Sequence, residues 1–230
     1  MLKSGVASEL PKTVTLNKPQ NYPVFKNPSE YLQCREGTFA TKSLKQKKEW
    51  RAMDRCFEKF SNVRSVCDVP CGPGRLFPYW EKRGLEIIGA ELSAEMADSA
   101  RQWIRKHNVP GRVETTDAFE LGIQKDQVDL VASVRFLYYF DDERRIDLLN
   151  SLARFSRRYL LLQYKTTETW KGRRNASRPS VDHGGPFEKR FVSNRRIEWE
   201  LARSDLNILS IETISRFSDR LFVAAEKNTV

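Results

Sequence analysis

The sequence predicts a doubly wound α/β fold: a seven-stranded sheet, mostly parallel, with helices on both faces and an antiparallel strand in a C-terminal hairpin. Two observations predict it. Strand-like apolar runs alternate with helix-like amphipathic segments, and the connections between them are short. At the C-terminus, two strand-like runs have only Ser218 and Asp219 between them, a spacing that requires an antiparallel hairpin.

The elements are justified in chain order by periodicity and capping signals. Trp50, Met53 and Phe57 recur at spacings of three and four, which predicts a helix. Ser93 is suited to begin a second helix and Asp141 a third. The expected order is a helix at 42–62, a strand at 63–69, a helix at 76–83, a strand at 85–92, a helix at 93–109, strands at 112–118 and 128–137, a helix at 141–155, a strand at 158–164, a helix at 194–206, and strands at 207–217 and 220–227.

Length and composition fit one globular domain. The chain has 230 residues, 40% of them hydrophobic and 30% charged. Residues 1–41 are polar and proline-spaced, which predicts a partly ordered N-terminal arm before a domain at 42–230. No stretch approaches the ~20 apolar residues of a membrane helix. The N-terminus lacks an apolar core of signal-peptide length, so a cytoplasmic location is expected.

The cysteines and the charge leave several function classes open. Four cysteines and two histidines show no zinc-ligand spacing, so reduced, mostly buried thiols are expected. The formal net charge is +10, and residues 165–196 hold nine Lys or Arg against three Asp or Glu. Such a stretch is either a solvated surface or a patch that attracts anions, such as a phosphorylated substrate or nucleic acid.

A glycine-rich turn, CDVPCGPGRL at 67–76, directly follows the first predicted strand. In doubly wound folds ligands bind at the carboxyl ends of the strands, and glycines there let the backbone approach a ligand closely. Glu91 ends the next predicted strand, where dinucleotide-binding folds place a ribose-binding acid. Asp68, at the tip of the first strand, would repel a pyrophosphate, and Phe77 stands at the third glycine position of that fingerprint. An acid at the tip instead suits a ligand with an ammonium or sulfonium group.

The motifs VCDVPCGPGR, GAEL, TTDAF and VDLVASVRFLYYFDD resemble the successive motifs of class I S-adenosylmethionine-dependent methyltransferases, a Rossmann-like family. The resemblance covers about residues 63–165 motif by motif and the remainder by architecture. Pro70 replaces the first glycine of the family's commonest first motif. The resemblance implies S-adenosylmethionine as cofactor.

Matching positions imply a cofactor site made of ten residues. Near the methionine part would lie Asp68, Cys71, Gly72 and Gly74, with Asp68 close to the ammonium group. Glu91 would accept hydrogen bonds from both ribose hydroxyls, and Leu92 would pack on the adenine. Asp117 would accept from the adenine amino group, and the backbone of Ala118 would read a ring nitrogen. Ser133 and Val134 would form the floor beneath the sulfonium.

The segment RFLYYFDD after the fourth strand is where the family usually meets its acceptor. It lacks the Asn/Asp-Pro-Pro-aromatic tetrapeptide of many amino-nitrogen methyltransferases and is similar to the same stretch in small-molecule methyltransferases. We assign Tyr138 to the catalytic site, and Tyr139 and Arg135 to acceptor binding. The tyrosines are also consistent with an ordinary core or rim. The fifth strand continues into Gln163-Tyr164-Lys165, which lacks the ligands of metal-dependent family members, so no catalytic metal is expected.

Residues 165–186 are expected to form a long basic loop at the carboxyl end of the fifth strand. Arg173 and Arg174 would hold an anionic acceptor, and His183 is the candidate catalytic base. A flexible surface insertion is the alternative. Three functions remain open: methylation of an anionic small molecule, sugar or lipid head group; methylation of RNA, which the positive charge favours; and cofactor binding without catalysis by a partner subunit. The oligomeric state is not predicted.

Overall fold

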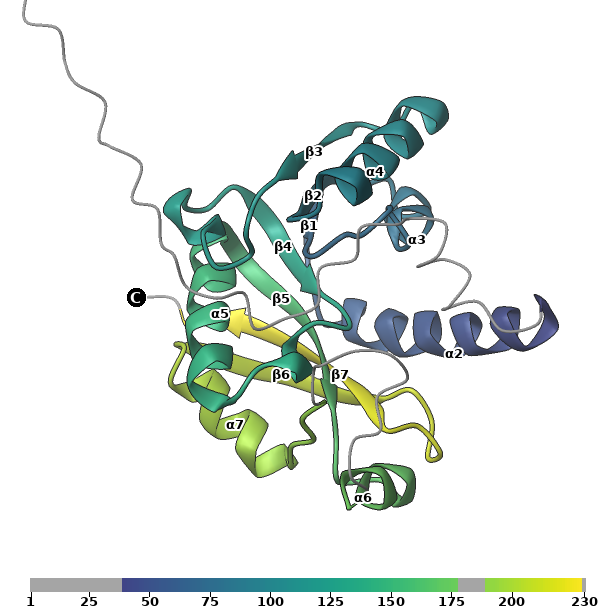
Figure 1. Cartoon of the computed structure of the whole chain (residues 1–230). Coiled ribbons are helices and arrows are strands. Elements are labelled where there is room, and N and C mark those ends of the chain that lie inside the picture. Colours follow the sequence, from purple (N-terminus) through teal and green to yellow (C-terminus); the bar gives the residue numbers. More distant parts are fainter. Residues whose placement is uncertain (1–38, 178–188, 229–230) are drawn as a thin grey trace, which may run out of the picture.

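The computed structural model describes residues 39–177 and 189–228 (Figure 1). Within them, seven strands form one sheet in the order β3-β2-β1-β4-β5-β7-β6. Strands β1 to β5 pair in parallel, and β7 is antiparallel to both of its neighbours, β5 and β6. This confirms the predicted fold class, including the reversed strand of the C-terminal hairpin.

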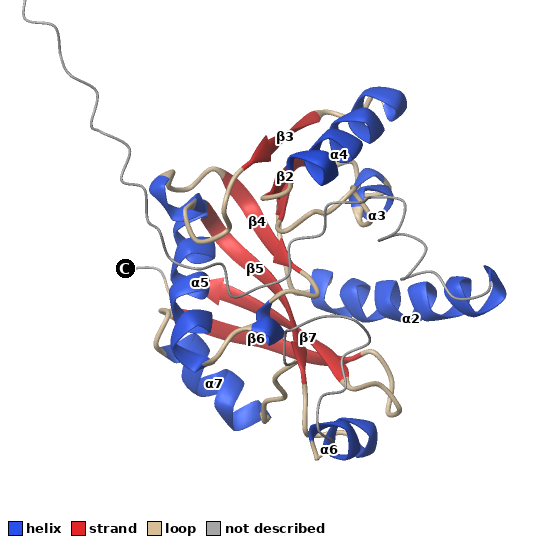
Figure 2. Cartoon of the chain, viewed as in Figure 1, coloured by secondary structure: helices blue, strands red, loops and turns tan. Residues whose placement is uncertain are grey.

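The elements alternate along the chain as expected, and Figure 2 shows helices on both sides of the sheet. The strands are β1 (Ser65–Asp68), β2 (Glu86–Glu91), β3 (Gly111–Thr115), β4 (Val128–Ser133), β5 (Ser156–Lys165), β6 (Leu206–Thr213) and β7 (Arg220–Lys227). The helices are α2 (Phe39–Phe57), α3 (Phe77–Glu81), α4 (Ala94–His107), α5 (Asp142–Phe155), α6 (Trp170–Ala176) and α7 (Asn194–Ala202), with short 3-10 helices η1 (Leu121–Ile123) and η2 (Leu137–Tyr139).

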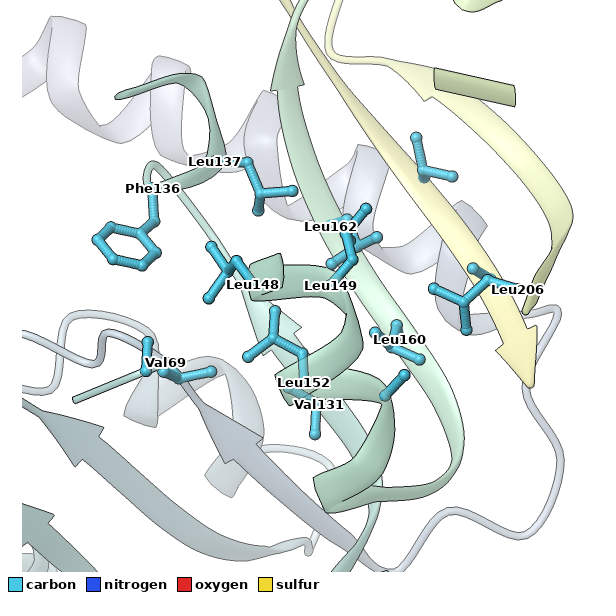
Figure 3. Close-up of a cluster of buried hydrophobic side chains, with 14 of the residues drawn as sticks. Val69, Val131, Phe136, Leu137, Leu148, Leu149, Leu152, Leu160, Leu162 and Leu206 are labelled. Carbon is cyan, nitrogen blue, oxygen red and sulfur yellow. The ribbon is translucent and has the colours of Figure 1, made fainter. Parts of the chain in front are cut away.

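The sheet separates two hydrophobic layers because successive side chains of a strand point to opposite faces. Cys67, Val131 and Leu160 belong to the layer that α5 and α7 cover. Their neighbours Val66, Leu130 and Leu161 belong to the layer under α2, α3 and α4. Figure 3 shows the first layer, where leucines of α5 meet those of β5. Burial on both faces explains why the central strands read as continuous apolar runs.

The two predicted helix caps are confirmed. Ser93 Oγ accepts a hydrogen bond from the Met96 N–H at 3.3 Å, and Asp141 Oδ1 accepts one from the Arg144 N–H at 3.0 Å. These side chains satisfy N–H groups that the first turn of a helix leaves without an intrahelical partner.

Two strand ends differ from the prediction. β4 stops at Ser133 instead of 137, because Arg135 adopts a left-handed conformation (φ 64°) that ends the extended chain. β6 stops at Thr213, so residues 214–219 connect the hairpin and the predicted two-residue turn is wrong. In that connection the Ser218 N–H bonds to the Ser215 carbonyl at 2.9 Å, which closes a separate turn.

The basic segment after β5 also differs from the expected loop. Its first part extends β5 to Lys165 and then forms α6, whose N-cap Thr169 accepts from the Gly172 N–H at 3.0 Å. Thr169 donates to the Ser218 carbonyl at 2.7 Å, and Asn175 donates to Asp219 at 3.1 Å. The described part of the segment is therefore a helix fixed to the β6–β7 connection.

Candidate cofactor site

The candidate site lies where β1 is flanked by β2 on one side and β4 on the other. The chain proceeds from β1 outward to β2 and β3, then crosses back to β4 and β5. Such a reversal opens a crevice at the carboxyl ends of the strands, where doubly wound folds bind their ligands. Asp68 ends β1, Glu91 ends β2 and Ser133 ends β4, so these three predicted site residues face one edge of the sheet.

The glycine turn after β1 is tightly packed. Gly72 and Gly74 have φ angles of 56° and 85°, in the left-handed region that favours glycine. A Cβ atom on Gly74 would lie 2.7 Å from Cδ2 of Phe77. The Cys71 N–H bonds to the Ala90 carbonyl at 3.0 Å, which fixes the turn to β2. The cysteine thiol donates to the Gly72 carbonyl at 3.3 Å, and burial raises its pKa well above the ordinary value.

Asp68 is a buried carboxylate with one unpaired oxygen. It is 2% exposed, and its enclosed Oδ2 atom has no hydrogen-bond partner among the described residues. Trp80, on α3, likewise has a buried Nε1 without a hydrogen bond there. Burial raises the pKa of Asp68 to about 7, although Arg75 and Trp80 act in the opposite direction. A cationic group beside Oδ2 would relieve this cost, because an opposite charge favours the ionised form.

Glu91 is held in a fixed orientation by two backbone amides. Its Oε2 accepts from the Gly72 N–H at 2.9 Å and its Oε1 from the Ser93 N–H at 3.0 Å. Burial raises its pKa, and these two N–H groups oppose the shift. Each oxygen keeps a further lone pair, so the carboxylate can still accept one hydrogen bond on each side from a ligand with two neighbouring hydroxyls.

The adenine-binding residues expected after β2 and β3 lie in loops. Leu92 is half-buried against the hydrophobic layer of α5. Asp117 comes two residues after β3, and its Oδ1 accepts from the Phe119 N–H at 3.0 Å. Ala118 is buried, and its N–H makes no hydrogen bond among the described residues. An aminopurine edge requires one acceptor and one donor, and the prediction that Asp117 Oδ2 and the Ala118 N–H supply them stays a prediction.

The expected floor of the site is buried. Ser133 is 0% exposed and its hydroxyl has no partner among the described residues, while Val134 is 6% exposed. Tyr138 and Tyr139 lie in η2, with ring centroids 4.7 Å apart. Tyr138 is 3% exposed, and its carbonyl accepts from the Arg190 N–H at 2.8 Å. This burial fits the core interpretation of Tyr138 as well as an aromatic wall.

The expected acceptor residues are not all brought together. Arg135 lies directly after the floor and forms an ion pair with Glu49 at 3.1 Å. Arg173 and Arg174 are exposed on α6, which Figure 1 places beyond the end of β5, with α2 between it and α3. His183 lies outside the described residues. The assignment of these four residues to the acceptor therefore stays a prediction.

Sequence reasoning missed Glu49, which lies on α2 and is 2% exposed. The sequence did contain a signal for this burial. Glu49 lies on the same helical face as Ala52, Met53 and Cys56, all buried at 0% exposure. An acid in an apolar stripe needs partners, and four of them occur among the described residues: Arg75 in the turn after β1, Arg135 after β4, Gln163 on β5 and Arg220 on β7.

Neither a metal site nor a membrane span occurs among residues 39–177 and 189–228. There, no three His, Cys, Asp or Glu side chains gather as a metal site, and no helix is both long and apolar enough to cross a bilayer. Cys56, Cys67 and Cys71 are buried free thiols, as expected.

Comparisons with known proteins agree with this geometry. Residues 66–158 match the family model described as a methyltransferase domain. Malonyl-[acyl-carrier protein] O-methyltransferase of Enterobacter lignolyticus is 29% identical over 140 residues, which cover 60% of this chain and 52% of that protein. A second such enzyme, from Salmonella typhimurium, is 43% identical over 44 residues, or 19% of this chain and 18% of its own length. The matches thus span about half of the first relative and less of the second.

Solved structures share the fold. Magnesium protoporphyrin IX methyltransferase of Synechocystis PCC 6803, with bound S-adenosylhomocysteine, superposes with a TM-score of 0.67 at 18% identity, covering 87% of this chain and 94% of that one. An S-adenosylmethionine-dependent methyltransferase of Clostridium acetobutylicum has a TM-score of 0.67 at 14% identity, with coverages of 87% and 99%.

The chain has the fold of the class I S-adenosylmethionine-dependent methyltransferases. More particularly, residues 66–158, from β1 to the beginning of β5, match a methyltransferase domain. The fold class expected from the sequence is confirmed, and the match to a methyltransferase domain agrees with the expected resemblance. Independence from metal ions stays a prediction.

Proposed function

We propose that the chain binds S-adenosylmethionine at the carboxyl ends of β1 to β4 and transfers its methyl group to an anionic small molecule. The observation that carries the proposal is the pair of buried carboxylates that end adjacent strands. Asp68 has an Oδ2 atom without a hydrogen-bond partner among the described residues and suits a cation, whereas Glu91 is oriented by two amides and keeps acceptor capacity for two hydroxyls. An ammonium group and a ribose diol are the groups that this pair would recognise.

In this proposal, the chain binds the cofactor in three parts. Asp68, Cys71, Gly72 and Gly74 surround the methionine part, and Glu91 with Leu92 holds the ribose and covers the adenine. Asp117 and the Ala118 N–H read the adenine edge, and Ser133 with Val134 closes the floor. The bound cofactor would supply a methyl group activated by the sulfonium. The residues contribute by holding this methyl in line with the acceptor, an effect of orientation worth several orders of magnitude in rate.

An anionic acceptor is supported by the cations on the β4 and β5 side. Arg135 follows the floor residues, and the Lys165 ammonium lies 5.7 Å from the ring centroid of Tyr138. Burial lowers the pKa of Lys165, while its ion pair with Asp219 at 2.5 Å opposes the shift. The relatives with the malonyl acceptor in their names are O-methyltransferases, and a malonyl group carries a carboxylate. We therefore favour a carboxylate-bearing acceptor and oxygen as the methylated atom.

The cofactor part is tested with Glu91→Ala. Removing two hydrogen bonds to a charged group should weaken S-adenosylmethionine binding by about 1.5–3 kcal/mol, or roughly ten- to a hundredfold. Isothermal titration calorimetry measures the affinity. The matched control is Glu86→Ala, at the exposed amino end of the same strand, which should bind as the original protein does. Equal affinity in both variants would remove Glu91 from the site.

The acceptor part is tested with methyl-labelled cofactor and cell extract fractionated into small molecules, RNA and protein. Label in the small-molecule fraction supports the proposal. RNA is the second candidate because the net charge is +10, and label there should come with RNA binding that weakens steeply with salt. Cofactor binding with no labelled product in any fraction would instead indicate a non-catalytic subunit.

A further inference from the structure

Glu49 is a buried acid that several cations share. Its side chain is 3% exposed and lies on α2, outside the matched domain at 66–158. Nη1 of Arg75 donates to it at 2.9 Å, Nη2 of Arg135 at 3.1 Å and Nε2 of Gln163 at 3.1 Å. Arg220 forms an ion pair with it at 3.6 Å. Burial opposes ionisation, but the arginines hold the pKa of Glu49 well below its usual range.

Two of these partners are direct chain neighbours of the proposed site. Arg75 follows Gly74 in the turn after β1, and Arg135 follows Val134 at the floor. The two arginines come from loops on the two sides of the crevice, so one carboxylate of α2 connects both. A substitution at Glu49 can therefore reach the site through Arg75 or through Arg135.

Arg75 lies between two buried carboxylates. Its charge acts on Asp68 and lowers the pKa of that carboxyl, so the guanidinium is near it. Even so, Asp68 forms no ion pair with Arg75 and keeps Oδ2 without a partner, whereas Glu49 takes the hydrogen bond from Arg75. The two acids compete for one guanidinium, and Glu49 binds it.

We propose that Glu49 is a positioning residue that keeps Arg75 away from Asp68, so that the Asp68 carboxylate stays available to the ammonium group of the cofactor. The inference rests on the proposed function, because it takes Asp68 as the residue nearest that ammonium group. It assigns α2 a part in cofactor binding that the matched domain does not contain. An exclusively structural Glu49 would stabilise the fold without changing how Asp68 titrates.

The decisive variant is Glu49→Gln, which keeps the shape and an acceptor oxygen but removes the charge. Arg75 should then pair with Asp68, and S-adenosylmethionine should bind about ten- to a hundredfold more weakly. The double variant Glu49→Gln/Arg75→Met removes the competing guanidinium as well, and it should recover most of the lost affinity. A double variant that binds no better than Glu49→Gln would overturn the proposal.

The pH profile of binding gives a readout that a structural role would not move. The groups that face Asp68 are Arg75, Trp80, Glu91, Cys67 and Cys71. In the original protein Asp68 gains its charge near pH 7, so affinity for the cationic ligand should rise about tenfold between pH 5.5 and pH 7. In Glu49→Gln, the new ion pair lowers the pKa of Asp68 and this rise should disappear. In the double variant it should return.

Glu200→Gln is the matched control, because Glu200 is also fully buried and paired with an arginine, on the opposite face of the sheet. It should melt at a lower temperature and keep both the affinity and the pH profile. If the original protein binds no S-adenosylmethionine, the proposed function fails. If it binds and Glu49→Gln binds equally with the same pH profile, only the present inference fails.

Should Glu49→Gln not fold, Arg75→Met alone decides the question. Glu49 then keeps Arg135, Arg220 and Gln163 as partners. Because Arg75 is not itself a cofactor ligand in the proposal, affinity should stay within about threefold of the original. A loss of tenfold or more would mean that Arg75 holds the cofactor directly, which would contradict the assigned role of Glu49.

Discussion

Glu200 and Asp68 are both buried carboxylates, on opposite sides of the molecule's central sheet, and their surroundings differ in one respect. Glu200, on α7, accepts from Nη2 of Arg145 at 2.7 Å and from Nε at 3.0 Å. Arg145, on α5, is itself 1% exposed and also donates to the Phe140 carbonyl and to Asp142. Asp68 has no such partner, and its charge is disfavoured up to about pH 7.

The difference distinguishes Glu200, which links two helices, from Asp68, which keeps an oxygen available for a ligand. The Arg145–Glu200 pair joins α5 to α7, 55 residues apart in the chain, and it satisfies both charges. A buried charge without a partner costs free energy, and proteins keep one mainly where a ligand will pair with it. Removing a charge should therefore lower the free energy of unfolding at the paired site and raise it at Asp68.

The largest effect is expected at the paired site. Arg145→Met leaves the buried Glu200 charge with only the longer ion pair to Arg196, at 3.7 Å. Loss of one member of a buried pair costs about 3–5 kcal/mol in free energy of unfolding. Urea denaturation measures the change. Adding Glu200→Leu to the same chain removes the orphaned charge and should recover most of the loss. If the double variant were no more stable than the single one, packing of the arginine would matter more than charge pairing.

At Asp68, a smaller change in the free energy of unfolding is expected, and it has the opposite sign. The pKa of Asp68 is raised from 3.8 in an exposed chain to about 7 in the fold, so its ionisation destabilises the native state as pH rises from about 4 to 7. Asp68→Asn does not titrate. Relative to the original protein, this variant should gain about 2–3 kcal/mol in free energy of unfolding between pH 5 and pH 8.

Denaturation curves of both proteins at the two pH values, without cofactor, measure this gain. The same substitution should weaken binding of S-adenosylmethionine, since it removes the charge opposite the ammonium group. An equal stability difference at pH 5 and pH 8 would mean that Asp68 is ionised in the native state over this whole range. The comparison with Glu200 would then lose its basis.

Much of the fold was accessible from the sequence because it depends on local patterns. Burial of the central strands on both faces leaves long apolar runs, and each run stops at the polar or glycine residue that begins a loop. Asp68 and Glu91 could therefore be placed at strand ends before any contact was known. The caps Ser93 and Asp141 follow the same local logic.

The missed features depend on contacts between distant residues. Glu49 bonds to Arg135 and Gln163, which are 86 and 114 positions away, so only the assembled sheet creates its cluster. Helix α6 could not be predicted, because its sequence has no apolar periodicity. It packs so closely on the residue after β5 that a Cβ atom on Gly172 would lie 1.8 Å from the Thr166 carbonyl oxygen. Local helix propensity does not predict such packing.

The smallest effect is expected at Asp117, a half-buried acid that is neither paired with a cation nor left fully open. One oxygen accepts from the Phe119 N–H and stabilises the loop, so the other is the one proposed to meet the adenine amino group. Asp117→Ala should weaken binding of S-adenosylhomocysteine by about 0.5–1.5 kcal/mol, the usual net worth of one hydrogen bond. Asp117→Asn keeps a carbonyl oxygen for the Phe119 N–H, but its NH2 group cannot accept from the adenine amino group, so this variant should bind about as weakly as the alanine variant.

Loss of the loop bond could weaken binding by itself, and a ligand change separates the two causes. The purine analogue of S-adenosylhomocysteine carries hydrogen in place of the amino group and keeps the ring nitrogens as acceptors, so it lacks only the donor for Asp117. If the contact exists, the analogue should bind the original protein more weakly than S-adenosylhomocysteine does. Asp117→Ala should reduce that difference, because the ligand change and the substitution remove the same contact. If the alanine variant weakens both ligands equally, Asp117 supports only its loop, and the adenine edge is read by the backbone at Ala118.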